Sequence, residues 1–147
     1  MDFKLELVVI PVSDVDRAKA FYVEQVGFNV DHDSDAEALR RRGHMVSDEY
    51  RVVQLTPPGS ACSIAVGQGM WDLPPGSLEG LQLVVSDIRA ARADLAERGA
   101  EISEVQVFDS GSFRPSREGD ALDNVGFAFF SDPDGNGWAL QQISARG

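Results

Sequence analysis

Hydrophobic positions along this chain follow a strand-then-helix pattern that occurs twice. Residues 7–12 form one apolar run and residues 81–85 another, and each run leads through a Ser-Asp pair into a segment with apolar side chains at helical spacing. The apolar positions correspond between the two segments: Val15, Ala18 and Tyr22 in the first, and Ile88, Ala91 and Leu95 in the second. The pattern therefore predicts an internal duplication in which each half begins with a strand and a helix.

The ends of both predicted helices carry matching signals. Asp14 and Asp87 stand where a side-chain oxygen can accept hydrogen bonds from the free N–H groups of the first turn. Gly27 and Gly99 stand where a glycine can end the helix. The two halves therefore share helix start and stop signals as well as hydrophobic spacing.

After each helix the pattern changes to that of strands separated by Gly- and Pro-rich turns. The predicted strands cover residues 28–31, 50–56 and 61–67 in the first half and 101–108, 125–131 and 138–143 in the second, with turns at 57–60 and 132–137. Each half thus reads as a βαβββ module. The modules span about residues 1–67 and 78–147, and residues 68–77 form a linker.

Two segments interrupt this plan. The spacing Ser34-x-x-Glu37 predicts a capping box and a short helix within residues 34–42 that ends at Gly43. Residues 109–124 contain three Gly, several charges and almost no apolar periodicity. We interpret this stretch as a long loop of the kind that serves as a lid or a flexible surface segment.

Length and composition indicate one cytoplasmic domain. The 147 residues, 43% of them hydrophobic and 25% charged, suffice for a single continuous core. No apolar stretch approaches the roughly 20 residues of a membrane helix, and the first residues lack the features of a signal peptide. The single cysteine, Cys62, excludes an intrachain disulfide and agrees with a reducing compartment.

The formal net charge of −11 bears on the partner. Binding to a phosphate backbone depends on Lys and Arg, so this charge argues against nucleic acid. The same charge favours a cationic ligand through its long-range field, although many acidic proteins are charged only for solubility. Both interpretations stay open at this point.

The motifs together resemble the vicinal oxygen chelate superfamily, which includes glyoxalase I, extradiol dioxygenases, fosfomycin-modifying enzymes and bleomycin resistance proteins. The resemblance rests on the paired modules, the Val-Ser-Asp helix starts, Phe21-Tyr22 before Gly27-Phe28, and Phe130-Ser-Asp-Pro-Asp-Gly-Asn136 before a strand. It implies an α+β fold in which the tandem βαβββ modules form a curved mixed sheet, or cup, with helices outside and a ligand inside.

Metal-using members of that superfamily carry four His, Glu or Gln ligands on the inner face of the cup. The resemblance places these positions at Leu7, Ala65, Gly80 and Ala139, none of which has a side chain that binds a metal. A shifted alignment brings in Gln82 or Gln141, which rescues one ligand position and not four. His32 and His44 with Asp31 form an alternative, improvised site, and simple solvation of these polar residues is the competing explanation.

The same positions mark an apolar pocket with a few hydrogen-bonding groups. Alternation along the strands adds four neighbours to the inner face, namely Val9, Ser63, Gln82 and Gln141. Trp71 in the linker and Phe113, Arg114 and Arg117 in the long loop are candidates for its rim, as stacking or anion-binding groups. The alternative is that these side chains only fill the core.

These observations give a metal-free small-molecule binding protein as the first hypothesis, one that sequesters an antibiotic or metabolite without cofactor or catalytic residues. The resemblance implies that the protein forms a homodimer. We expect no nucleic-acid or membrane partner. The second hypothesis is a glyoxalase- or dioxygenase-like enzyme, a lyase, isomerase or oxygenase acting on a small oxygenated metabolite. A third is a subunit whose partner supplies the chemistry.

Overall fold

The computed structural model describes residues 1–68 and 72–145. The chain divides into two compact units, of which the first comprises Met1–Leu78 and Asp132–Asn136. The second comprises Glu79–Ser131 and Gly137–Gly147. The predicted folding of both halves as a single domain stays a prediction, because each unit is defined by its own internal packing.

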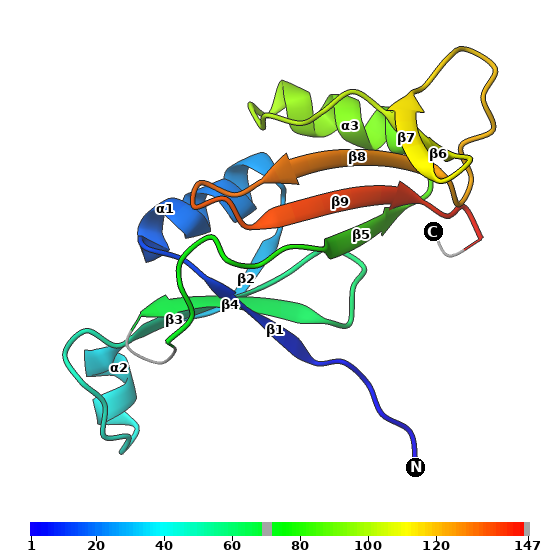
Figure 1. Ribbon diagram of the computed structural model, residues 1–147. Coiled ribbons are helices and arrows are strands. Elements are labelled where there is room, and N and C mark those ends of the chain that lie inside the picture. The colour runs from blue at the N-terminus through cyan, green and yellow to red at the C-terminus, as the bar shows by residue number, and fades with distance from the viewer. Residues whose placement is uncertain (69–71, 146–147) are drawn as a thin grey trace. The chain divides into compact units, whose positions relative to one another are not determined.

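The first unit contains a four-stranded mixed sheet in the order β1-β4-β3-β2 (Figure 1). Its strands are β1 (Leu7–Pro11), β2 (Asn29–Asp35), β3 (Arg51–Thr56) and β4 (Ser63–Gln68). β1 runs parallel to β4 and the other pairs are antiparallel. Helix α1 (Val15–Ala20) continues as a π-helical turn, η1 (Phe21–Gln25), and packs against β3 and β4, while the short α2 (Ala36–Arg41) follows β2.

The core of the first unit lies on one face of its sheet. Ile10, Val53, Leu55 and Val66 are fully buried, and strand pairing places them on a common face. The predicted apolar stripe of α1 is buried as well, through Val15, Ala18 and Tyr22. The hydrophobic periodicity of the sequence therefore identified the core-facing side of this helix correctly.

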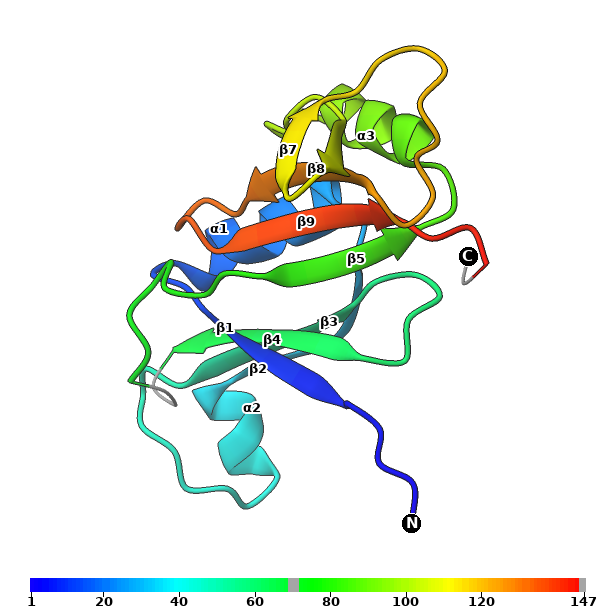
Figure 2. The same cartoon turned by 45° about the vertical axis from the view of Figure 1, so that its right-hand side comes forward.

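The second unit repeats this plan with one additional strand, in the order β5-β9-β8-β6-β7 (Figure 2). Its strands are β5 (Leu81–Val85), β6 (Gln106–Asp109), β7 (Ser112–Pro115), β8 (Gly126–Ser131) and β9 (Gly137–Gln142). Helix α3 (Ile88–Glu97) packs against β8 and β9. The predicted α+β class is confirmed, and the described residues form two mixed sheets, of four and five strands, the second with one strand more than the predicted βαβββ module. A cup formed by both halves stays a prediction.

α1 and α3 begin at their predicted N-caps, and α3 ends at its predicted glycine. The side chain of Asp14 accepts a hydrogen bond from the backbone N of Arg17 at 3.0 Å, and that of Asp87 accepts one from the backbone N of Ala90 at 3.1 Å. Gly99 ends α3 with a φ of 95°, a left-handed conformation that glycine adopts without strain.

The short helix starts one residue later than the capping box predicts. Asp35, not Ser34, is its N-cap, and the Asp35 side chain accepts a hydrogen bond from the backbone N of Ala38 at 2.8 Å. Ser34 instead pairs with Val52 as part of β2, which runs four residues beyond the predicted end at residue 31. Sheet pairing with β3 therefore overrides the local Ser34-x-x-Glu37 signal.

The segment predicted as a long loop contains a strand. β6 and β7 form a hairpin with Asp109 opposite Ser112, and the two turn residues between them, Ser110 and Gly111, have φ angles of 55° and 88°. Such a turn matches the twist of the flanking strands. In turn, the predicted strand over 101–108 starts only at Gln106, and Ile102 forms an isolated bridge with Phe130.

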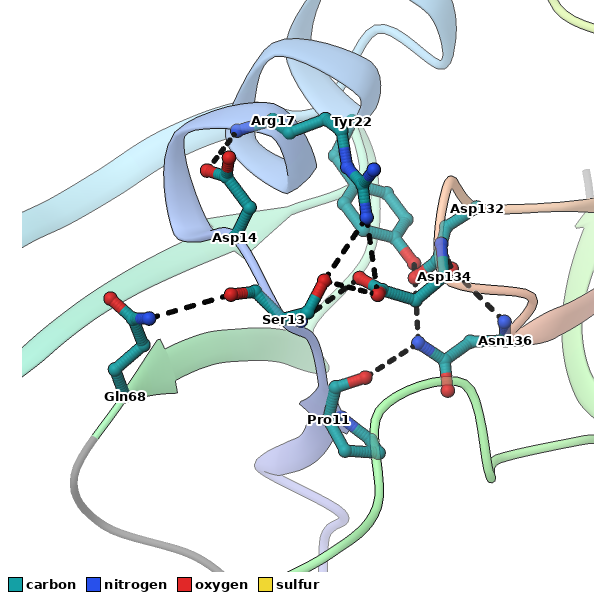
Figure 3. Close-up of polar contacts among 9 residues, drawn as sticks. All are labelled: Pro11, Ser13, Asp14, Arg17, Tyr22, Gln68, Asp132, Asp134 and Asn136. Carbon is teal, nitrogen blue, oxygen red and sulfur yellow. Dashed lines mark hydrogen bonds and ion pairs between the residues drawn. The ribbon is translucent and has the colours of Figure 1, made fainter.

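The loop from Asp132 to Asn136 connects β8 to β9, yet it belongs to the first unit (Figure 3). Asn136 is fully buried and donates through Nδ2 to the carbonyl of Pro11 and to Asp132, both at 2.8 Å. Its Oδ1 accepts from the backbone N of Leu78 at 3.1 Å. The Asp-Pro-Asp-Gly-Asn motif thus fixes the end of β1 to a loop more than 100 residues later in the chain.

The two aspartates of this loop hold η1 and the start of α1 in place. Asp132 is buried and accepts a hydrogen bond from the hydroxyl of Tyr22 at 2.8 Å. Asp134 accepts from the backbone N and the hydroxyl of Ser13 at 3.1 and 2.6 Å, and Arg17 contacts the same carboxylate at 3.2 Å (Figure 3). The motif therefore joins β1, α1 and η1 of the first unit through hydrogen bonds.

None of the helices in residues 1–68 and 72–145 is both long and apolar enough to cross a membrane.

Candidate ligand-binding faces

Strand pairing brings the predicted pocket residues of the first half together. Leu7 lies opposite Ser63 and Val9 lies opposite Ala65 across β1 and β4. Ala65 lies opposite Gln54 of β3, which pairs with His32 of β2. Because paired residues share a face, these side chains occupy the side of the sheet opposite the buried core; we call it the Leu7 face.

Hydroxyl and carboxylate groups form a row at one end of the Leu7 face. The Thr56 hydroxyl donates a hydrogen bond to the Asp31 carboxylate, and the Thr56 and Ser63 hydroxyl oxygens are 2.6 Å apart. Asp31 is the extra residue of a β-bulge, because Val30 pairs with Leu55 and His32 with the adjacent Gln54. A bulge re-aims side chains, and here it turns Asp31 toward Thr56.

The pocket residues predicted in the second half also share a face. Gln82 lies opposite Ala139 of β9, Ala139 lies opposite Phe129 of β8, and Gln141 lies opposite Phe127. The other face of this sheet carries Gln142, whose side chain accepts a hydrogen bond from the backbone N of Ile88 at 3.0 Å. Helix α3 therefore covers the opposite side, and we call the side with Gln82 and Gln141 the Phe127 face.

Four phenylalanines cluster on the Phe127 face. The ring of Phe113 meets those of Phe127 and Phe129 edge to face, with centroids 5.3 and 5.2 Å apart, and the latter two rings are parallel at 6.2 Å. Phe108 packs edge to face against Phe113 at 5.1 Å. Phe108 and Phe113 each remain 45% exposed. The cluster therefore presents aromatic surface on the strands of the second unit.

Sequence reasoning found only Phe113 of this cluster. The alternation rule places Phe127 and Phe129 on the same face of β8, and the pairing of Phe129 with Ala139 makes that face the predicted inner one. The alternation along β8 thus indicated that Phe127 and Phe129 share a face. Only the pairing of β8 with β9 shows that this face is the predicted inner one.

The polar groups of the Phe127 face form a chain of amides. The Gln82 side-chain NH₂ donates to the Gln141 side-chain oxygen. The Gln141 NH₂ donates to the backbone carbonyl of Asn124 at 2.9 Å. Gln82 is exposed, so one end of this chain faces outward beside Ala139.

The structure describes three of the four predicted rim residues and separates them. The fourth, Trp71, lies outside the described residues. Phe113 belongs to the phenylalanine cluster, whereas Arg114 pairs with the buried Val107 and therefore points to the α3 side of the sheet. Arg117 is exposed in the following loop, where its backbone N donates to Asp120 at 2.6 Å.

Arg114 is engaged by carboxylates of its own unit. It donates to both oxygens of Asp120 at 3.0 and 3.1 Å and to Asp109 at 3.1 Å. This fork-like geometry is the one by which arginine binds carboxylates most strongly. The predicted anion-binding role of Arg114 finds no support in this arrangement, and the residue holds the β6–β7 hairpin to the loop that follows it.

The Arg114–Asp120 pair predicts a pH-dependent contribution to stability. Hydrogen bonds from Arg114 and from the backbone N of Arg117 lower the pKa of Asp120 from 3.8 to about 2. Because the folded-state pKa is lowered, the contribution is present above about pH 4 and is lost as the pH falls toward 2. We expect Asp120→Asn to destabilise the protein at pH 6 and to have a smaller effect at pH 2.5, as measured by urea unfolding.

The matched control is Asp72→Asn, which changes an exposed aspartate and is expected to leave the urea midpoint unchanged at pH 6. An Asp120→Asn variant as stable as the parent at pH 6 would contradict the contribution assigned to this pair.

A family model for the glyoxalase/bleomycin resistance protein/dioxygenase superfamily matches residues 4–140. The chain belongs to this superfamily. TnmS3, an antibiotic-binding protein from Streptomyces sp. CB03234, is 32% identical over 97% of this chain and 98% of its own, with a TM-score of 0.69. A glyoxalase/bleomycin resistance protein from the same organism is also 32% identical, over 95% of this chain and 100% of its own, with a TM-score of 0.66.

A third superfamily member, from Sphaerobacter thermophilus DSM 20745, is 26% identical over 96% of this chain and 98% of its own, with a TM-score of 0.68. The search of curated proteins gave no match to this chain. The resemblance inferred from the repeated modules and the Asp-Pro-Asp-Gly-Asn motif is therefore confirmed at the level of the superfamily.

The residues that the resemblance places at the superfamily's metal positions do not fit a metal ion. Leu7, Ala65 and Ala139 have aliphatic side chains and Gly80 has none, so none of the four offers a donor atom. Within residues 1–68 and 72–145, no group of three His, Cys, Asp or Glu side chains converges in a way that could hold a metal. The improvised His32, His44 and Asp31 site does not form, because His32 lies on β2 while His44 follows α2 beside a surface hollow lined by Arg40 and Met45.

Proposed function

We propose that this member of the superfamily binds a small, mainly aromatic molecule and sequesters it without transforming it. The phenylalanine cluster of the Phe127 face carries this proposal, because aromatic side chains that stay partly exposed on a sheet are suited to contact a planar ligand. The similarity to TnmS3, an antibiotic-binding protein, supports an antibiotic or a related metabolite as the ligand.

The Phe127 face offers aromatic contact area. Phe127 and Phe129 lie on β8, and the buried Ala139 lies beside Phe129 on β9. A flat ring system can therefore contact the phenylalanines and extend across β9 toward the exposed Gln82. Ring contacts of this kind are worth about 0.5–1.5 kcal/mol each beyond the area that they bury.

We also propose that the Leu7 face contacts a ligand, because its side chains are apolar or small. These are Leu7, Val9, Ser63 and Ala65. We also propose that the chain folds as a single domain, forms a homodimer and is located in the cytoplasm. Because the metal positions lack donor atoms, we derive no metal-dependent step, and the protein's contribution is a shaped surface that holds the ligand.

Replacing Phe113 with alanine tests the aromatic site. Phe113 contacts three other rings, so its loss is expected to weaken the binding of 2-naphthol, an aromatic probe, by about three- to tenfold. Binding is measured by ¹H–¹⁵N NMR titration, which also shows whether the variant is folded. Phe113→Leu keeps an apolar side chain without a ring and is expected to recover only part of the affinity.

Phe3→Ala is the matched control, since Phe3 is 89% exposed and lies outside both faces. Equal affinity of the parent and Phe113→Ala, or chemical-shift changes confined to residues outside the two faces, would refute the aromatic site. Mass spectrometry of the recovered probe separates sequestration from catalysis, because an altered product would favour the enzyme hypothesis.

A further inference from the structure

We infer that the ligand presents a hydrogen-bond donor, a hydroxyl or N–H group, to the side-chain oxygen of Gln82. This inference rests on the proposed function and specifies its ligand class further. It follows from the direction of the amide chain on the Phe127 face, which is fixed by a group that can only accept.

The chain begins at the backbone carbonyl of Asn124, which has no hydrogen to donate. The Gln141 side chain must therefore direct its NH₂ toward this carbonyl, as the 2.9 Å hydrogen bond shows. Asn124 itself is held by a hydrogen bond from its backbone N to the carbonyl of Gln142 at 2.7 Å. The Asn124 carbonyl thus fixes which end of the Gln141 side-chain amide points toward it.

The orientation of Gln141 in turn sets that of Gln82. With its NH₂ used by Asn124, Gln141 presents its oxygen to Gln82, and Gln82 must donate its NH₂ to that oxygen. The opposite orientation of Gln82 would bring two amide oxygens together. Gln82 is exposed, so its own oxygen is directed outward as an acceptor.

The position of Gln82 relates this acceptor to the phenylalanines. Gln82 and Phe129 both pair with Ala139, from opposite sides of β9. Two strand spacings separate them, which is about 10 Å. A fused-ring ligand that contacts Phe129 and crosses Ala139 therefore has its far edge near the Gln82 oxygen, where a phenolic hydroxyl or an aromatic amine can donate.

A second series of hydrogen bonds, on the Leu7 face, also begins at a group that can only accept. The Asp31 carboxylate only accepts, so the single hydroxyl hydrogen of Thr56 is used there. Ser63 must then donate to Thr56 across their 2.6 Å contact, which leaves the Ser63 oxygen with acceptor capacity. Both chains of hydrogen bonds thus end at a group with acceptor capacity, the exposed Gln82 and the buried Ser63, and the net charge of −11 adds to the preference for donor or cationic groups.

A pair of probes that differ only in the donor tests this inference. 2-Naphthol carries a hydroxyl, and in 2-methoxynaphthalene a methyl group replaces its hydrogen. We expect 2-naphthol to bind about three- to tenfold more tightly, the range for one net hydrogen bond. In Gln82→Leu, the ratio of the two affinities is expected to fall to about one.

Gln141→Leu tests the positioning role of Gln141. With Gln141 removed, Gln82 is free to turn either its oxygen or its NH₂ outward, so the ratio is expected to fall although Gln82 is unchanged. The ¹H–¹⁵N NMR spectrum of the variant shows whether it is folded, which separates this loss of orientation from a general structural defect. Gln25→Leu, a matched change in η1 away from both faces, is expected to keep the parent ratio.

The outcomes separate this inference from the proposed function. Equal binding of both probes to the parent protein, or an unchanged ratio in Gln82→Leu, would overturn the donor requirement and leave the aromatic site standing. If neither probe shifts the resonances of the Phe127 face, the proposed function fails and the donor requirement fails with it.

Discussion

Replacing Asn136 with alanine is expected to lower the free energy of unfolding by about 3 kcal/mol. Asn136 is fully buried, and its side chain makes three hydrogen bonds, to Pro11, Leu78 and Asp132. Alanine would remove all three hydrogen bonds, each worth about 1 kcal/mol, and would leave the half-buried N–H of Leu78 without this partner. Urea unfolding followed by circular dichroism measures the change.

Two controls isolate the origin of this effect. Asn29→Ala changes an exposed asparagine and is expected to stay within about 0.5 kcal/mol of the parent. Tyr22→Phe removes only the hydroxyl that donates to Asp132, and we expect a loss of about 1 kcal/mol. A loss below about 1 kcal/mol for Asn136→Ala, with an unchanged denaturant slope, would show that the loop does not stabilise the first unit.

Replacing Gly76 with alanine is the second substitution with a large expected effect, about 2–4 kcal/mol. The φ angle of Gly76 is 79°, and a Cβ at this position would collide with the backbone carbonyl oxygen of Asp134. A backbone oxygen cannot turn away as a flexible side chain can. The substitution therefore adds a steric clash to the strain of the left-handed conformation, and thermal unfolding measures the sum.

Gly59 provides a matched control for this prediction. Its φ angle is 82°, nearly the same as that of Gly76, but no atom lies within 4 Å of the place that a Cβ would occupy. Gly59→Ala should therefore show the backbone strain alone, about 1–2 kcal/mol. Equal losses for the two variants would mean that the loop moves away from residue 76 without appreciable cost.

The sequence was most informative where local rules decide the structure. The helix starts at Asp14 and Asp87 follow from capping chemistry that acts over three residues. Alternation placed Leu7 with Val9, and Ser63 with Ala65, on common faces, and the register between β1 and β4 joined the two pairs. Local periodicity therefore predicted which residues share a face, which is the information that a binding surface requires.

Features that depend on how strands pair with one another were missed. β7 has little hydrophobic pattern of its own and exists through its pairing with β6, and Arg114 contacts Asp109 and Asp120. The bulge at Asp31 depends on how β2 meets β3, which single-strand patterns do not encode. The hydrogen-bond directions at Gln82 and Ser63 likewise appear only once the neighbouring acceptors are in place.

The contacts of the Asp132–Asn136 loop bear on the order in which the parts of the first unit fold during synthesis. Asn136 follows its partner Pro11 by 125 residues, so all the residues between them must leave the ribosome before this contact can form. The first unit therefore cannot be completed before residue 136 has been translated. Its early strands and α1 emerge first, but their final hydrogen bonds wait for residues 132–136.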